Sequence, residues 1–147
     1  MEKIPQRTHD DCTICVVAMV MGPPYTYERV SQDSQKYPRV DSEGHGIAWW
    51  KDYLNNEGFD AEQRPLSDLR SFSDLTALSP DSRAMLVFQI PYLKTGHIVA
   101  IDELGVIDPQ EHPTVYRSVD DFCGIFKIEG WRLYSAHFWL VRKRNAP

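Results

Sequence analysis

Four residues of this chain, far apart in the sequence, have the types and the order needed to break an acyl bond through a thiol. Cys12 stands before an apolar segment, and Gln6 lies six residues upstream of it. His97 and Asp108 each border a short apolar run much later in the chain. In such a set the thiol attacks a carbonyl, the histidine moves its proton, the acid orients the histidine and the amide donates to the oxyanion.

The surroundings of Cys12 favour a reactive thiol over a buried packing residue. The four residues before it, Thr-His-Asp-Asp, are polar, whereas the segment 14–21 has the apolar composition of a buried helix. We expect Gly22 and the two prolines after it to end that helix, and Asp10 or Asp11 to cap its start. Because a helix N-terminus carries roughly half a positive charge, a thiol placed there ionises more easily and becomes a better nucleophile.

Cys12 and Cys15 also form a C-x-x-C pair, which leaves two other interpretations open. A redox dithiol of the thioredoxin type needs a strand before the motif, and only a loop is predicted there. A zinc site needs two further ligands, and no spacing motif links His9 or Cys123 to the pair. Cys15 lies one helical turn further into the apolar segment, where a packing residue is typical. We therefore expect Cys12 to be the nucleophile, with no metal and no organic cofactor.

Two apolar segments predict a hairpin that brings His97 close to Asp108. A two-residue loop at 103–104 would pair Val99 with Asp108 and place His97 two residues along on the same face. Such diagonal neighbours are about 7–8 Å apart, within reach of a side-chain hydrogen bond. A three-residue loop would change this register. In the two-residue case Asp108 orients His97, which takes the proton from Cys12.

Gln6 is the candidate side-chain donor to the oxyanion. The alternative is that Gln6 is an ordinary surface residue. The position of Gln6 six residues before Cys12 is what suits it to the catalytic role. The backbone N–H of Cys12 would be the second donor. One such donor typically stabilises a transition state by about 3 kcal/mol.

The composition is that of an ordinary globular protein and narrows the classes of partner. The 147 residues suit a single domain, 1–147, with 42% hydrophobic residues and a net charge of −5. The basic residues are scattered except at 142–144, so we expect no nucleic-acid partner. No apolar run reaches the ~18 residues of a membrane span, and the N-terminus lacks the apolar stretch of a secretory signal. With three cysteines, an odd number, these features predict a cytoplasmic protein with free thiols and no membrane partner.

Helical patterns precede most strand patterns along the chain. Besides the segment after Cys12, helices are predicted at 25–30, 47–56 and 67–78, with a loop at 31–41. Strands are predicted at 59–63, 84–90, 97–102, 106–108, 122–128 and 133–141. This order predicts an α+β domain in which N-terminal helices pack on an antiparallel β-sheet.

The candidate residues and their neighbours resemble the papain-like cysteine peptidase family that removes double-glycine leaders from bacteriocin precursors. The resemblance rests on Gln6, on Asp11-Cys12 with Ala18-Met19, on Gly96-His97-Ile98-Val99 and on Asp108-Pro109. It implies a papain-like fold with Gln6 as oxyanion donor, Cys12 as nucleophile, His97 as base and Asp108 as orienter. Thr13 stands where that family usually has glycine, and the familiar leader peptidases are fused to a transporter that this sequence does not contain. Because a fold does not fix its substrate, these two differences argue against leader processing. A stand-alone peptidase or isopeptidase is therefore expected.

We expect a cysteine hydrolase that cleaves a peptide or isopeptide bond in a peptide or protein substrate. Acyl transfer to an amine by the same triad, as in transglutaminases, is one alternative. A catalytically inactive, peptidase-like protein-binding module is the other. Thr13 favours this second alternative, because its side chain would narrow the approach to the thiol, whereas the complete set of four residues favours hydrolysis. The sequence predicts no particular oligomeric state.

Overall fold

The part of the chain that the structure describes contains three helices and six strands. The computed structural model describes residues 1, 3–8, 11–65, 68, 83–90, 95–103, 105–110, 115–116 and 132–144. The helices are α1 (Cys12–Met21), α2 (Tyr27–Ser34) and α3 (Trp49–Asn56). The strands are β1 (Phe59–Pro65), β2 (Arg83–Ile90), β3 (Thr95–Asp102), β4 (Gly105–Ile107), β5 (Val115–Tyr116) and β6 (Arg132–Lys143).

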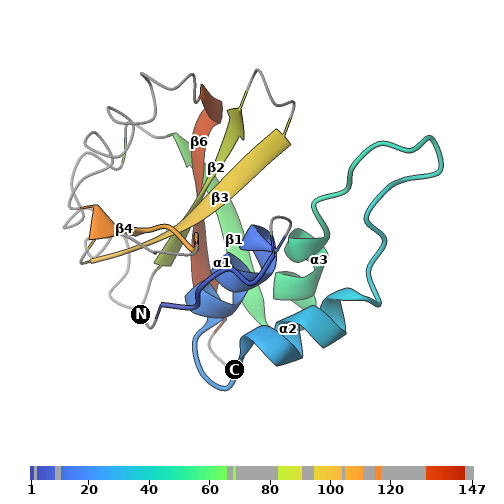
Figure 1. Ribbon diagram of the computed structural model, residues 1–147, viewed down its shortest axis with the longest axis horizontal. Coiled ribbons are helices and arrows are strands. Elements are labelled where there is room, and N and C mark those ends of the chain that lie inside the picture. Colours follow the sequence, from blue (N-terminus) through green and yellow to red (C-terminus); the bar gives the residue numbers. More distant parts are fainter. Residues whose placement is uncertain are drawn as a thin grey trace.

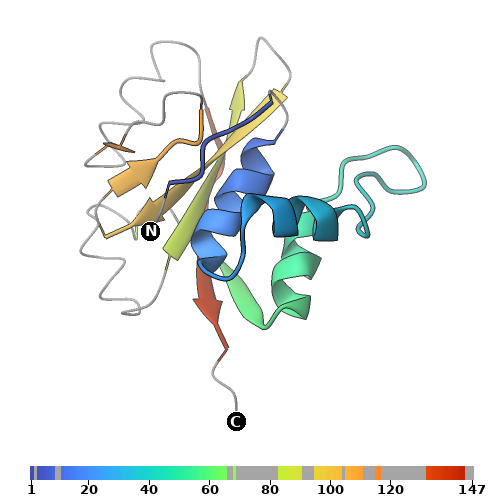
Figure 2. The ribbon, with the colours of Figure 1, turned by 60° about the horizontal axis from the view of Figure 1, so that its bottom comes forward.

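The strands form one antiparallel sheet, and the helices gather on one side of it (Figure 1). The strand order is β1-β6-β2-β3-β4-β5, and each neighbouring pair is antiparallel. The predicted α+β class, with helices on an antiparallel sheet, is therefore confirmed for the described residues. Figure 2 shows α1 lying beside the sheet, where it packs against β3. This contact brings the start of the chain to the strand that carries His97.

The apolar composition of α1 explains its burial. Every side chain from Cys15 to Met21 is at most 7% exposed. These side chains belong to the same buried cluster as Met85, Ile98 and Ala100 of the sheet. Although α1 is strongly apolar, it has only ten residues, and none of the described helices is both long and apolar enough to cross a membrane.

Gly22 ends α1 as predicted, for two physical reasons. Its φ of +71° lies in the left-handed region that favours glycine, and its N–H donates to the carbonyl of Ala18 at 3.0 Å. A Cβ at this position would lie 2.8 Å from Nη1 of Arg83, which donates to the carbonyl of Met19 at 3.0 Å. The missing side chain therefore lets an arginine satisfy a carbonyl of the last turn.

The predicted side-chain cap at Asp11 is wrong. Asp11 occupies the N-cap position of α1, but its carboxylate makes no hydrogen bond to the first turn. Its Oδ2 instead accepts from the N–H of Arg7 at 2.9 Å and from the hydroxyl of Tyr27 at 2.8 Å. Two donors outside the helix thus replace the expected backbone amide. Asp10, the other predicted cap, lies outside the described residues.

Helix α2 begins and ends later than predicted. The hydroxyl of Thr26 accepts from the N–H of Arg29 at 3.2 Å, so the helix starts after this cap and not at Tyr25. It continues to Ser34, inside the stretch predicted as loop. The reason is that Val30 and Ser34, one turn apart on the same face, are both fully buried.

The remaining elements differ from the prediction mainly at their ends. Helix α3 begins at Trp49, two residues later than predicted, and Gly58, with a φ of +88°, follows its end as expected. Strand β1 continues to Pro65, which pairs with His137 of β6. The two-residue strand β5 is not predicted, because so short a segment carries no periodic signal. Apart from Asp68, the helix predicted at 67–78 falls outside the described residues, and so does the strand predicted at 122–128.

Candidate active site

The hairpin of β3 and β4 brings His97 and Asp108 together. Asp102 pairs with Gly105 across a two-residue loop, which gives the register expected from the sequence. The Nε2 atom of His97 lies 2.8 Å from Oδ1 of Asp108. Both side chains are buried, with 7% and 4% of their surfaces exposed. The hydrogen bond that the hairpin predicts is therefore present.

Burial and hydrogen bonding act in opposite directions on the charge of His97. Burial lowers its pKa, because an imidazolium loses its hydration there. The hydrogen bond to Asp108 and a second one to the side chain of Cys12 together outweigh burial, and they raise the pKa of His97 from 6.5 to about 9. His97 is therefore a cation at neutral pH. Beside a thiol, such a cation stabilises the thiolate and holds a proton for a leaving group.

Cys12 opens the first turn of α1 and interacts with His97 across the contact between α1 and β3. Its side chain is 9% exposed, so the thiol is largely but not completely enclosed. The first amides of a helix have no partner within the helix, and the N–H of Cys12 is one of them. The arrangement can therefore direct a nucleophile, a proton carrier and a backbone donor at one carbonyl group.

Gln6 is tied to the residue that follows Asp108. Its backbone N–H donates to the carbonyl of Pro109. The N-terminal segment thus passes beside the end of the β3–β4 hairpin, and the side chain of Gln6 is half-buried there. The structure brings all four predicted residues to the region where the start of α1 meets this hairpin.

Cys15 has none of the surroundings of a nucleophile. Its side chain is fully buried, and its Sγ lies 3.5 Å from the carbonyl oxygen of Pro5. Burial, with smaller contributions from the charges of Asp11 and Cys12, raises the pKa of the Cys15 thiol from 9 to about 12. Cys15 is therefore neutral at physiological pH and serves the packing role expected from its position.

The C-x-x-C pair consists of two free thiols, Cys12 and Cys15. Within the described ranges, no group of three or more His, Cys, Asp and Glu side chains is arranged to hold a metal ion. His9 and Cys123, the further ligands that a zinc site would recruit, fall outside those ranges.

Asp11 is a further candidate that spacing alone does not reveal. It is 4% exposed, and its second carboxylate oxygen, Oδ1, is buried with no hydrogen-bond partner among the residues that the structure describes. Arg7, whose N–H it accepts, directly follows Gln6, and Asp11 itself directly precedes Cys12. The only signal in the sequence is an acid adjacent to the candidate nucleophile.

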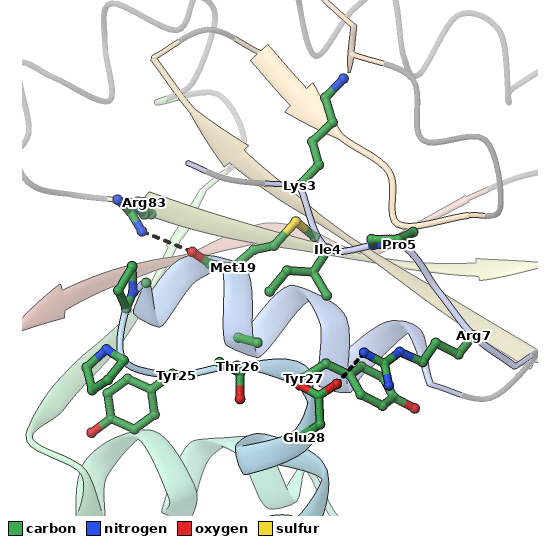
Figure 3. A pocket seen from close by; sticks show the side chains of 14 residues that line it. Lys3, Ile4, Pro5, Arg7, Met19, Tyr25, Thr26, Tyr27, Glu28 and Arg83 are labelled. Carbon is green, nitrogen blue, oxygen red and sulfur yellow. Dashed lines mark hydrogen bonds and ion pairs between the residues drawn. The ribbon is translucent and has the colours of Figure 1, made fainter.

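A pocket of about 290 Å³ is present beside α1, separate from the four candidate catalytic residues (Figure 3). It is bounded by Lys3, Ile4, Pro5 and Arg7 of the N-terminal segment, by Ala18 and Met19 of α1, by the segment 22–28 and by Arg83. None of Gln6, Cys12, His97 and Asp108 lines it. The pocket is therefore a feature distinct from the candidate site, although Arg7 and Tyr27 belong to its wall.

No protein-family model matches the chain, and no curated protein matches it either.

Proposed function

We propose that this chain is a cysteine hydrolase of the papain-like class, which cleaves a peptide or isopeptide bond through Cys12, His97, Asp108 and Gln6. The observation that carries the proposal is the position of His97. Its Nε2 is held at 2.8 Å by a buried carboxylate, and it also hydrogen-bonds the side chain at the start of α1. A nucleophile, a base and an orienting acid linked in this order form a catalytic triad.

The proposed reaction begins with the thiolate of Cys12 attacking the carbonyl carbon of the scissile bond. A carbon–sulfur bond forms, and the carbonyl electron pair moves onto oxygen. The amide of Gln6 and the N–H of Cys12 donate to this oxyanion. When the intermediate collapses, the carbon–nitrogen bond breaks and His97 gives its proton to the leaving amine. Water then attacks the thioester, with His97 as the base, and releases the acid and the free thiol.

The charge state of His97 fits the first half of this cycle. With a pKa of about 9, the imidazole is protonated at neutral pH, so the resting site holds an imidazolium that stabilises the thiolate form of Cys12. Asp108 accepts the hydrogen bond from Nε2 and leaves the other ring nitrogen for Cys12. The carboxylate thereby fixes the orientation of the ring as well as its charge.

The experiment that tests the proposal uses p-nitrophenyl acetate as a general acylating probe. Wild type, Cys12→Ala and Cys15→Ala are mixed with the ester, and the acetylated cysteine is identified by peptide mass spectrometry. We expect rapid acetylation of Cys12 in wild type and in Cys15→Ala. In Cys12→Ala the rapid phase should be absent. A peptide library added to wild type should then be cleaved, and the cleaved bonds identify the specificity.

Two results would contradict the proposal. Acetylation of Cys12 no faster than that of a free cysteine peptide would mean that the site lacks its chemistry and that the chain is a binding module. Rapid acetylation of Cys12, followed by loss of the acetyl group only when an amine is added, would instead identify acyl transfer.

A further inference from the structure

The backbone on both sides of Gln6 is fixed by hydrogen bonds. The N–H of Gln6 donates to the carbonyl of Pro109, and the next N–H along the chain, that of Arg7, donates to Oδ2 of Asp11 at 2.9 Å. Two successive amides are thus held by two different parts of the molecule. Since the position of the Gln6 side chain depends on this backbone, these two bonds restrict where its amide can point.

The carboxylate of Asp11 is held in turn by helix α2. The hydroxyl of Tyr27, the first residue of that helix, donates to the same Oδ2 at 2.8 Å. The bond to Asp11 raises the pKa of the Tyr27 hydroxyl, as expected for a phenol that donates to a carboxylate. Asp11 therefore links the residue after Gln6 to a helix that contributes none of the four candidate catalytic residues.

Burial of Asp11 is not explained by the stability of the helix start. Its side chain is 4% exposed, it does not cap α1, and its Oδ1 has no hydrogen-bond partner within the described chain. An unpaired buried carboxylate oxygen is costly, and such groups in native proteins call for an explanation. The side chain of Arg7 does not neutralise it, because this guanidinium pairs with Glu28 and stacks over the ring of Tyr27 (Figure 3).

We propose that Asp11 is a positioning residue, which holds the Gln6 amide at the distance from the N–H of Cys12 that an oxyanion hole requires. This inference rests on the proposed hydrolase function. Asp11 is adjacent to Cys12 in the chain and hydrogen-bonds the residue after Gln6, so one side chain fixes both donors relative to each other. Tyr27 completes the device by fixing the rotamer of Asp11.

Two reactions of the same thiol separate this role from a merely structural one. In alkylation by iodoacetamide the thiolate displaces iodide, a carbon–sulfur bond forms, and no oxyanion develops. In acylation by p-nitrophenyl acetate the thiolate adds to the carbonyl, the electron pair rests on oxygen, and p-nitrophenolate leaves. An oxyanion donor accelerates only the second reaction. The ratio of the acylation rate to the alkylation rate at Cys12 therefore reports the oxyanion hole and is insensitive to a general loss of thiol reactivity.

The experiment measures this ratio in wild type, Gln6→Ala, Asp11→Ala, Asp11→Asn and Tyr27→Phe. Gln6→Ala should lower it by about 10²–10³-fold, the usual effect of removing one oxyanion donor. Asp11→Ala should lower it by tenfold or more. Asp11→Asn keeps an acceptor oxygen for the N–H of Arg7 and should recover most of the loss. Tyr27→Phe should lower the ratio by a few-fold.

Tyr53→Phe is the matched control. The hydroxyl of Tyr53 on α3 donates to Asp33 of α2 at 2.8 Å. It therefore makes the same kind of bond, at the same distance, as the Tyr27 hydroxyl makes to Asp11. This control should leave the ratio unchanged while costing stability. Glu28→Gln is the second control, because it removes the charge of the exposed pair with Arg7, and it should have no effect on the ratio.

The outcomes distinguish the inference from the function on which it rests. If wild-type Cys12 reacts with both reagents no faster than a free cysteine peptide, the proposed function and the inference both fail. If Gln6→Ala leaves the ratio unchanged, no oxyanion donor exists there for Asp11 to position, and the inference fails. If Gln6→Ala lowers the ratio but Asp11→Ala and Tyr27→Phe do not, the hydrolase stands and only the inference is overturned. Should Asp11→Ala fail to fold, Tyr27→Phe alone decides.

Discussion

The two cysteines of α1 lie one helical turn apart, and their surroundings differ. Cys12 hydrogen-bonds His97 at the edge of the core, where 9% of its side chain is exposed. Cys15 is fully buried, and burial raises the pKa of its thiol to about 12. The first position provides a cationic neighbour for a thiolate, whereas the second penalises any charge.

The elements packed around the two thiols therefore say more about their reactivity than the spacing of the pair does. In a C-x-x-C motif on one helix, both thiols fall on one side, so the motif itself does not indicate which of them reacts. The packing of α1 against β3 makes them unequal, because it brings His97, which Asp108 holds, to the side chain of Cys12.

Asp108→Asn should make Cys12 behave much more like Cys15. The variant keeps the shape of the side chain but removes the carboxylate that orients His97 and stabilises its charge. Loss of the acid from a triad is severe, so acetylation of Cys12 by p-nitrophenyl acetate should fall by about a hundredfold or more. Asp60→Asn, which changes an exposed carboxylate on β1, is the control and should keep the wild-type rate. A fall of less than threefold in Asp108→Asn would show that the acid is not part of the site.

The contribution of His97 to stability should disappear as the pH rises. Its folded pKa of about 9 exceeds the unfolded value near 6.5, so below pH 6.5 the folded and unfolded states both hold the proton and the charged pair stabilises the fold fully. Between pH 6.5 and 9 the contribution, up to about 3 kcal/mol, is lost. Urea unfolding of wild type and His97→Gln at several pH values measures it. The gap in free energy of unfolding should narrow as pH increases, and a constant gap would contradict the raised pKa.

Cys15→Ala should affect only packing. Removing a fully buried sulfur leaves a small cavity, so the free energy of unfolding should fall by about 1–2 kcal/mol. Acetylation of Cys12 should stay within twofold of wild type, since burial keeps the Cys15 thiol neutral and it has no part in the proposed triad. Chemical denaturation and the ester assay measure both quantities. Loss of Cys12 reactivity in this variant would mean that the two thiols act together.

The parts of the structure that short segments determine were predictable from the sequence. The apolar run after Cys12 and the glycine-proline stop at Gly22 gave the correct helix end, because both signals lie within the helix itself. The β3–β4 register followed from a two-residue loop and placed His97 beside Asp108. In each case the decisive interactions join residues close together in the chain.

The parts that depend on distant contacts were not predictable. Asp11 looks like a helix cap because acids favour that position, and its actual partner, Tyr27, comes from the next helix. The extension of α2 to Ser34 depends on burial against neighbouring elements, which a polar sequence does not reveal. The sequence favoured Cys12 over Cys15 as the nucleophile from local polarity, whereas the raised pKa of the Cys15 thiol depends on burial in the folded core.

The most direct test of the account is the rate of iodoacetamide labelling of Cys12 as a function of pH, in wild type and in His97→Ala. Peptide mass spectrometry would resolve Cys12 from the other cysteines. A working pair predicts fast labelling that persists well below pH ~8.5, the unperturbed thiol pKa, and that becomes slow in the variant, while Cys15 stays unlabelled in both. Slow labelling of Cys12 that His97→Ala leaves unchanged would contradict the account and identify a fold without hydrolase chemistry.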